Sequence, residues 1–251
     1  MIHLKSADEI AAIARAGAIL GRLFQELRLR VTPGVSTGEL DRFAEEFIRD
    51  HPGAEPAFKG LYGFPGSICA SVNEEVVHGI PSPRRLLEEG DTISIDAGVR
   101  LDGWYADSAR TFPVGSIDAK TRRLLDVTRD ALDRGIEQAH VGNRIGDVGH
   151  AVQTAAEAAG FSVVRELVGH GLGREPHEEP QIPNFGRPGH GAALQRGLVV
   201  AIEPMINAGV EGVRTLRDRW TVVTLDAERS AHFEHTVAIT ADGPRILTGP
   251  D

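Results

Sequence analysis

An internal repeat with acidic residues in matching places constrains the fold of this chain more than any single motif. Three pairs of segments resemble each other in the same order along the chain: 33–40 with 141–148, 77–80 with 169–172, and 87–96 with 194–203. The last pair ends in a carboxylate in both copies, Asp96 and Glu203. Repeated units that cannot bury their apolar faces alone pack against each other. We therefore expect one pseudo-twofold domain over residues 1–251, with equivalent strands bringing acidic residues to a shared centre.

Hydrophobic periodicity predicts four helices and a set of strands. Two of the helices begin at capping boxes, in which Ser6 is followed by Glu9 and Ser36 by Glu39. The predicted helices cover 7–29, a run from Ser36 to a stop at 51–53, 119–139 and 145–159; the predicted strands cover 93–101, 104–112, 198–202, 221–225 and 233–240. This order favours an α+β fold over regular alternation of helices and parallel strands.

The first two strands predict a hairpin that brings two aspartates together. Asp102-Gly103 is a two-residue turn signal. With this turn, Asp96 lies opposite Ala109 and Asp107 lies opposite Gly98. The two aspartates are then diagonal neighbours on one face of the sheet. Such a pair is costly to desolvate and requires protons or cations.

Two more acids and a histidine are candidates for the same centre. Glu203 ends the aliphatic strand 198–202, and strand alternation places Glu234 on the face opposite Phe233. The repeat pairs Asp96 with Glu203 and, more loosely, Asp107 with Glu234. His170 lies between glycines, which allow the backbone to approach a ligand closely. Each residue alone could be a solvated strand end or an exposed histidine. Together they suit two divalent ions such as Mn, Fe, Co or Zn, which polarise a carbonyl and activate water.

Composition and charge exclude several classes of protein. The chain has 251 residues, of which 41% are hydrophobic and 25% charged, as in ordinary globular proteins. The single cysteine, Cys69, excludes an internal disulfide and a thiolate metal cage. A net charge of -9 without a basic cluster argues against direct binding of nucleic acid. The N-terminal residues lack a signal-peptide pattern and no apolar run could span a membrane, so we expect a cytoplasmic protein.

Several motifs in this order resemble those of the type I methionine aminopeptidases of metallopeptidase family M24. The segments that carry the resemblance are 73–81, 95–107, 169–173, 177–180, 202–204 and 234–236. The resemblance covers nearly the whole chain. It implies the duplicated pita-bread fold, a curved antiparallel sheet with helices on its outer face.

The resemblance also implies roles for individual residues. Asp96 would bind one metal ion, His170 and Glu203 the other, and Asp107 and Glu234 would bridge both. His78 would contact the scissile amide, and His177 would hydrogen-bond the substrate carbonyl. Glu203 would also transfer a proton. If the resemblance did not extend to their roles, the two histidines would be loop-packing residues.

The same resemblance implies a pocket for the methionine side chain. Its lining would consist of Phe58, Leu61, Phe64, Cys69 and Trp220, although each could equally be an ordinary core residue. Leu61 stands where relatives often carry tyrosine, and Pro176 where many carry a bulky side chain. A flexible thioether would be accepted, and branched or charged first residues excluded.

The implied activity is removal of the initiator methionine from nascent chains when the second residue is small. The enzyme would use two divalent ions, be a monomer, and contact the ribosome surface at most transiently. Because Ile2 is large, the protein should keep its own Met1. Two alternatives remain: another pita-bread hydrolase such as aminopeptidase P or prolidase, which resemble longer chains with an additional N-terminal domain, or a non-catalytic module that binds peptides or ribosomes.

Overall fold

Within residues 2–249, four helices flank the strands. The computed structural model describes residues 2–249, so the expectation about Met1 lies outside the described residues. The helices are α1 (Ala7–Arg30), α2 (Thr37–Arg49), α3 (Ala119–Glu137) and α4 (Ile145–Ala158), and a short 3-10 turn, η1, covers Leu61–Gly63. All four lie within two residues of the predicted ranges.

The two predicted capping boxes are formed. The Ser6 hydroxyl accepts from the Glu9 backbone N–H, and the Glu9 carboxylate accepts from the Ser6 backbone N–H at 2.8 Å. Ser36 and Glu39 form the same reciprocal pair at the start of α2. Each box satisfies amide groups that the first turn of a helix leaves without partners, and this fixes where α1 and α2 begin.

Within residues 2–249 the strands pair antiparallel in four hydrogen-bonded sheets. Most of the strands are short. In the first sheet the long strand β4 (Thr92–Leu101) pairs along its whole length with β5 (Trp104–Pro113), and it also pairs with the shorter strands β1 (Ala54–Pro56) and β2 (Ile68–Val72). The largest sheet has the order β15-β14-β9-β7-β8. Its members are β7 (Gly169–Gly171), β8 (Glu178–Ile182), β9 (Val199–Ile202), β14 (His235–Thr240) and β15 (Gly243–Ile246).

Two small sheets complete the strands. One has the order β13-β10-β6, and the other β11-β12-β3. Their members are β3 (Glu75–Val77), β6 (Ser162–Val163), β10 (Met205–Asn207), β11 (Val213–Thr215), β12 (Val222–Thr224) and β13 (Ser230–His232). All six of these strands have three residues or fewer, which is too short for an alternating hydrophobic pattern to be recognised.

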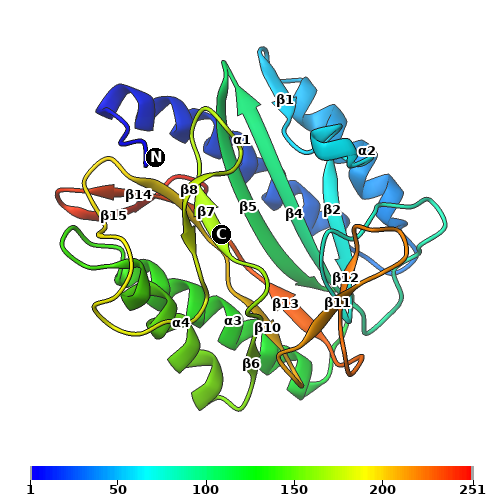
Figure 1. Cartoon of the computed structure of the whole chain (residues 1–251). Coiled ribbons are helices and arrows are strands. Elements are labelled where there is room, and N and C mark those ends of the chain that lie inside the picture. Colours follow the sequence, from blue (N-terminus) through cyan, green and yellow to red (C-terminus); the bar gives the residue numbers. More distant parts are fainter. Residues whose placement is uncertain (1, 250–251) are drawn as a thin grey trace.

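The predicted duplication is visible in the arrangement of elements (Figure 1). Helices α1 and α2 pack on the sheet of β4 and β5, whereas α3 and α4 pack on strands of the second half such as β9 and β10. Each half has its own hydrophobic core, one centred on α1 and β4, the other on α3, α4 and β9. The α+β pita-bread organisation expected from the repeat is therefore present.

The β4–β5 hairpin has the predicted register. Asp96 lies opposite Ala109 and Gly98 lies opposite Asp107. The two turn residues, Asp102 and Gly103, have φ angles of 52° and 80°. A two-residue turn of this left-handed kind matches the twist of the flanking strands, so the pairing continues to the strand ends without a bulge.

The predicted strand 233–240 is wrong at its first two residues. The strand β14 begins at His235, and Phe233 and Glu234 form the break between β13 and β14. Here the Phe233 amide donates to the Pro204 carbonyl, and the Glu234 amide donates to the Ala109 carbonyl on β5. The chain changes its pairing partner at this point, so strand alternation does not determine where the Glu234 side chain lies.

Hydroxyl side chains join the two halves along a seam between β5 and residues 232–236. The Ser108 hydroxyl donates to the Glu234 carbonyl at 2.8 Å, and the Thr111 hydroxyl accepts from the His232 amide at 2.8 Å. From the other side, the Thr236 hydroxyl donates to the Asp107 carbonyl at 2.8 Å. These buried bonds hold β5 against the second half where a continuous backbone ladder is missing.

None of the helices in residues 2–249 is both long enough and apolar enough to cross a membrane.

Candidate active site

A cavity of about 550 Å³ lies between the two halves, and it gathers every residue predicted from the sequence to form the site. The predicted residues in its lining are Phe58, Leu61, Phe64, Cys69, His78, Asp96, Asp107, His170, His177, Glu203, Trp220 and Glu234. They come from segments spread over most of the chain. The structure therefore brings all twelve side chains to one place.

Two pairs of neighbouring strands bring four carboxylates together. In the first half, the hairpin register makes Asp96 and Asp107 diagonal neighbours. In the second half, β9 pairs with β14 so that Ile202 lies opposite His235. The residues just beyond this pair are Glu203 and Glu234, and their buried carboxylates are close enough to interact. Each half therefore contributes two acids from adjacent antiparallel segments, as the repeat predicted.

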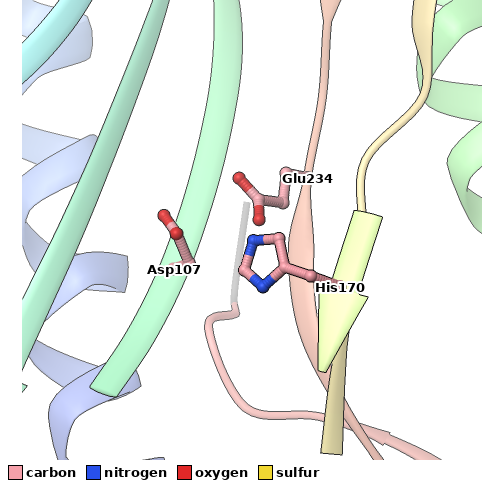
Figure 2. Close-up of side chains that lie close together, drawn as sticks. All are labelled: Asp107, His170 and Glu234. Carbon is pink, nitrogen blue, oxygen red and sulfur yellow. The ribbon is translucent and has the colours of Figure 1, made fainter. Parts of the chain in front are cut away.

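His170 on β7 completes the cluster (Figure 2). One ligand atom from each of Asp107, His170 and Glu234 lies within 4.8 Å of the others, and the three side chains point toward one another from β5, β7 and the break between β13 and β14. The Nε2 atom of His170 also lies 3.6 Å from Oε1 of Glu203. These separations are short enough for one cation to contact several donors at once.

The hydrogen bond of His170 prepares its other nitrogen to bind a metal. Its Nδ1 lies 2.9 Å from the Gly171 carbonyl oxygen, which can only accept a hydrogen bond. In the neutral ring Nδ1 therefore carries the hydrogen, and the Nε2 lone pair faces the carboxylates. Burial lowers the pKa of His170 to about 4, so the ring is neutral at pH 7. This is the tautomer and protonation state of a metal-ligating histidine.

The four carboxylates are costly to ionise, because they are buried close to one another. Burial, together with the neighbouring acids, raises the pKa values of Asp96, Glu203 and Glu234 well above the ordinary range. Burial raises the pKa of Asp107 to about 7. Oδ1 of Asp96, Oδ1 of Asp107 and Oε1 of Glu234 are buried and have no hydrogen-bond partner within residues 2–249.

This donor set fits divalent cations. Buried oxygens without partners are destabilising unless a cation or a proton neutralises them. Four carboxylates and one imidazole, with no thiolate among them, are the oxygen and nitrogen ligands that Mn, Fe, Co and Zn accept. Four negative charges would also balance two divalent ions.

An apolar slot adjoins the acidic cluster. Phe58, Phe64 and Cys69 form a small buried cluster of their own, separate from the two main cores, with Leu61 and Trp220 packed against it. Cys69 on β2 lies opposite Asp96 on β4, so the slot opens directly beside a carboxylate. Phe58, Phe64 and Cys69 are buried, as core residues are, and all five residues of the slot also line the cavity.

Two histidines and two aromatic rings lie around the cavity. His78 has a φ of 59°, a left-handed backbone angle that is uncommon for residues other than glycine, and its ring faces Trp220 edge-on. The His177 ring lies 4.5 Å from the His170 ring and stacks on Tyr62 at 6.1 Å, measured between ring centroids. Burial lowers the pKa values of His78 and His177, so both rings are neutral at pH 7.

Sequence reasoning missed three residues that contact this site. Nε2 of His232 lies 3.6 Å from Oε2 of Glu203, and burial lowers the pKa of His232 to about 3. Tyr62 covers His177 with a side chain that is 76% exposed, and Glu178 also lines the cavity. Glu178 follows His177 directly and belongs to the resembling segment 177–180. This position next to a candidate histidine is the feature from which Glu178 could have been predicted as a site residue. Pro176, by contrast, is not among the described residues that line the cavity.

Comparison with known proteins agrees with this geometry. Residues 11–241 match the family model described as metallopeptidase family M24. A methionine aminopeptidase of Clostridium perfringens (strain 13 / Type A) is 54% identical over 99% of both chains. The crystal structure of a methionine aminopeptidase from Thermotoga maritima superposes with a TM-score of 0.97 at 43% identity, covering 100% of both chains.

Prolidases share the fold at a greater distance. The structure of the prolidase from Pyrococcus furiosus superposes with a TM-score of 0.79 at 23% identity, and the match covers 99% of this chain but 66% of the prolidase. This likeness shows the fold alone. The full-length match at 54% identity is with a methionine aminopeptidase. The chain therefore belongs to metallopeptidase family M24, as one of its pita-bread methionine aminopeptidases.

Proposed function

We propose that this protein removes the initiator methionine from nascent polypeptides when the second residue is small, and that it does so with two divalent metal ions. One observation carries the proposal: four carboxylates and a neutral imidazole converge at the floor of a cavity whose wall is an apolar slot. The first feature suits a dinuclear hydrolytic centre, and the second suits an unbranched apolar side chain.

In this proposal the five ligands divide between two ions. Asp96 would hold one ion, His170 and Glu203 would hold the other, and Asp107 and Glu234 would serve both. When bound, such ions polarise a carbonyl group and ease the deprotonation of water. The side chains of the protein set the charge and the donor geometry of that site. Asp107 and Glu234 both lie at the seam, where the backbone carbonyl of each accepts a hydrogen bond from a hydroxyl group of the opposite half. This placement agrees with a role shared between the two ions.

The remaining polar residues bind and orient the peptide. A neutral His177 can donate one hydrogen bond to the carbonyl oxygen of the substrate, where negative charge develops during the reaction. A neutral His78 contacts the scissile amide. The raised pKa of Glu203 keeps this carboxyl near the range in which it can accept and return a proton.

The slot formed by Phe58, Leu61, Phe64, Cys69 and Trp220 selects the first residue. Its walls are aromatic and aliphatic, and the edge-on contact of Phe64 with Trp220, 5.1 Å between centroids, gives the slot a fixed shape. A thioether side chain is unbranched and polarisable, so it can fill such a slot. A charged first residue would lose its hydration without gaining a partner.

Peptides with matched sequences test this proposal. The protein is treated with EDTA, then supplied with Mn, Co or Fe, and assayed with Met-Gly-Met and Met-Leu-Met. We expect methionine release that requires the added ion and is faster for Met-Gly-Met. Cleavage restricted to bonds before proline would instead assign the protein to the prolidase or aminopeptidase P type, and absence of any hydrolysis would leave a binding module. We expect the protein to be a cytoplasmic monomer whose partners are the N-termini of nascent chains.

A further inference from the structure

The loop that carries His177 joins β7 to β8 and is held in place by an unusual anchor. Residues 174, 175 and 177 of this loop are exposed, whereas residues 172, 173 and 176 are buried. The Glu178 carboxylate closes it: Oε1 accepts from the Arg174 amide at 2.9 Å and from the Glu175 amide at 3.3 Å. Glu178 follows His177 directly in the chain. Movement of the Glu178 side chain would therefore break the hydrogen bonds to the amides of Arg174 and Glu175, next to the histidine.

Lys5 fixes the other oxygen of Glu178. The Lys5 Nζ lies 2.6 Å from Oε2 of Glu178, and the two side chains are 4% and 9% exposed. Nζ also donates to the His3 carbonyl at 3.0 Å. Solvent screens such a pair little. For contrast, the Lys120–Glu228 pair has a similar length of 2.7 Å, but its side chains are 60% and 48% exposed.

The backbone on both sides of this pair is also held. The Lys5 amide donates to the Gly197 carbonyl at 2.6 Å, which fixes Lys5 to the turn before β9. Gly173 passes so close to the pair that a Cβ there would overlap Cε of Lys5. The Gly173 carbonyl accepts from the Tyr105 amide at 2.9 Å, and the Arg174 guanidinium lies 3.9 Å from the Trp104 ring. The loop is thus pinned between the N-terminal segment and the tip of the β4–β5 hairpin.

We propose that Lys5 is a positioning residue for His177, acting through Glu178. The buried ammonium orients the carboxylate, the carboxylate holds the amides of Arg174 and Glu175, and the closed loop holds the imidazole at the cavity. Lys5 touches no substrate. The inference rests on the proposed function, because it assumes that His177 hydrogen-bonds the peptide carbonyl.

Kinetics of Lys5→Met test this role. Methionine keeps an unbranched apolar stem as far as the Cε position of lysine but lacks the ammonium group. We expect kcat for Met-Gly-Met to fall by about 10- to 100-fold, since small displacements of a positioned group have effects of this size. KM should change by less than about threefold, because His177 acts mainly where charge develops in the transition state. Lys120→Met makes the same substitution in the exposed pair, and its kcat should equal that of the wild type.

A second variant and a second measurement keep the test independent of activity. Glu178→Gln retains an oxygen for the two loop amides but removes the anion that Lys5 binds. In Lys5→Met and in Glu178→Gln, the amides of Arg174 and Glu175 should exchange hydrogen at least about 10-fold faster, while those of β4 keep their wild-type rates. The double variant should lose no more activity than the more affected single variant.

The proposal is overturned if Lys5→Met retains wild-type kcat, if the losses of the two single variants multiply in the double variant, or if the loop amides keep wild-type exchange. Should Lys5→Met not fold, Glu178→Gln decides by its own kcat and by the exchange of its loop amides, because it removes the anion that Lys5 binds. A wild-type protein without methionine release would refute the proposed function, whereas the exchange rates would still show whether Lys5 holds the loop.

Discussion

Replacing Asp107 with asparagine should make the metal-free protein more stable while removing its metal-dependent activity. Asp107 is buried and faces Asp96, Glu234 and His170 at the centre of the site. Asparagine has nearly the same shape but no charge at any pH. The substitution therefore removes the penalty of a buried carboxylate and also removes a ligand.

The size of the effect follows from the pKa of Asp107. The unfolded chain releases this proton near the ordinary value of 3.8, and the folded protein releases it near 7 because the carboxyl is buried. The folded pKa is the higher one, so the penalty is absent below 3.8, grows as the pH rises, and is complete above 7. With about 1.4 kcal/mol for each pH unit, it amounts to about 2 kcal/mol at pH 5 and about 4 kcal/mol at pH 7.5.

Urea unfolding in excess EDTA, followed by circular dichroism, measures this difference directly. We expect Asp107→Asn to exceed the wild type in unfolding free energy by the amounts above at the two pH values. Histidines with lowered pKa values, such as His170 and His232, affect both proteins alike and largely cancel in the comparison. Asp147→Asn is the matched control, because hydrogen bonds from the Arg144 and Gly189 amides lower the pKa of Asp147. Asp147→Asn should lower the free energy of unfolding, and it should do so by more at pH 7.5 than near pH 3.

An Asp107→Asn protein equally or less stable than the wild type at both pH values would refute the argument. So would a difference that does not increase with pH. Adding a divalent ion should reverse the order, because the ion stabilises the folded wild type by binding it and should bind the variant more weakly.

Three further outcomes follow from the site. Glu234→Gln should weaken metal binding by about 10- to 100-fold, measured by titration calorimetry, because it removes the negative charge of a buried, proposed metal ligand. His177→Ala should lower kcat/KM for Met-Gly-Met by about 100- to 1000-fold with unchanged metal content, if its ring stabilises the developing negative charge. Cys69 should react with a thiol reagent at least about 100-fold more slowly in the folded protein than in urea, since burial and the nearby carboxylates of Asp96 and Asp107 raise its pKa.

The sequence was sufficient to predict those parts of the site that depend on local pairing. Asp96 and Asp107 are neighbours because a two-residue turn determines the register of the whole hairpin, and both the turn and the alternation are visible in the sequence. Glu203 could be placed because it ends a continuous aliphatic strand. The capping boxes at Ser6 and Ser36 likewise depend only on residues three positions apart.

Other parts depend on contacts between distant segments and were not predictable in the same way. Strand alternation placed Glu234 on a regular strand, but its amide bonds to β5 instead of a neighbouring strand of its own sheet. Short strands such as β10 and β13 contain too few residues to show a period. The pairing of Lys5 with Glu178 has no local signal, since each residue alone is typical of an exposed position.

The hydroxyl groups along the seam hold the two pairs of site carboxylates at a fixed spacing. Ser108, Thr111 and Thr236 each bond to a backbone group of the opposite half, and none of these side chains is longer than two bonds from its own backbone. Such short tethers leave little freedom for one half to slide past the other. Discrimination between cations of different radius would then depend on serine and threonine residues that never touch an ion, and exchanging them for larger or smaller neighbours is a route to changing metal preference without altering a ligand.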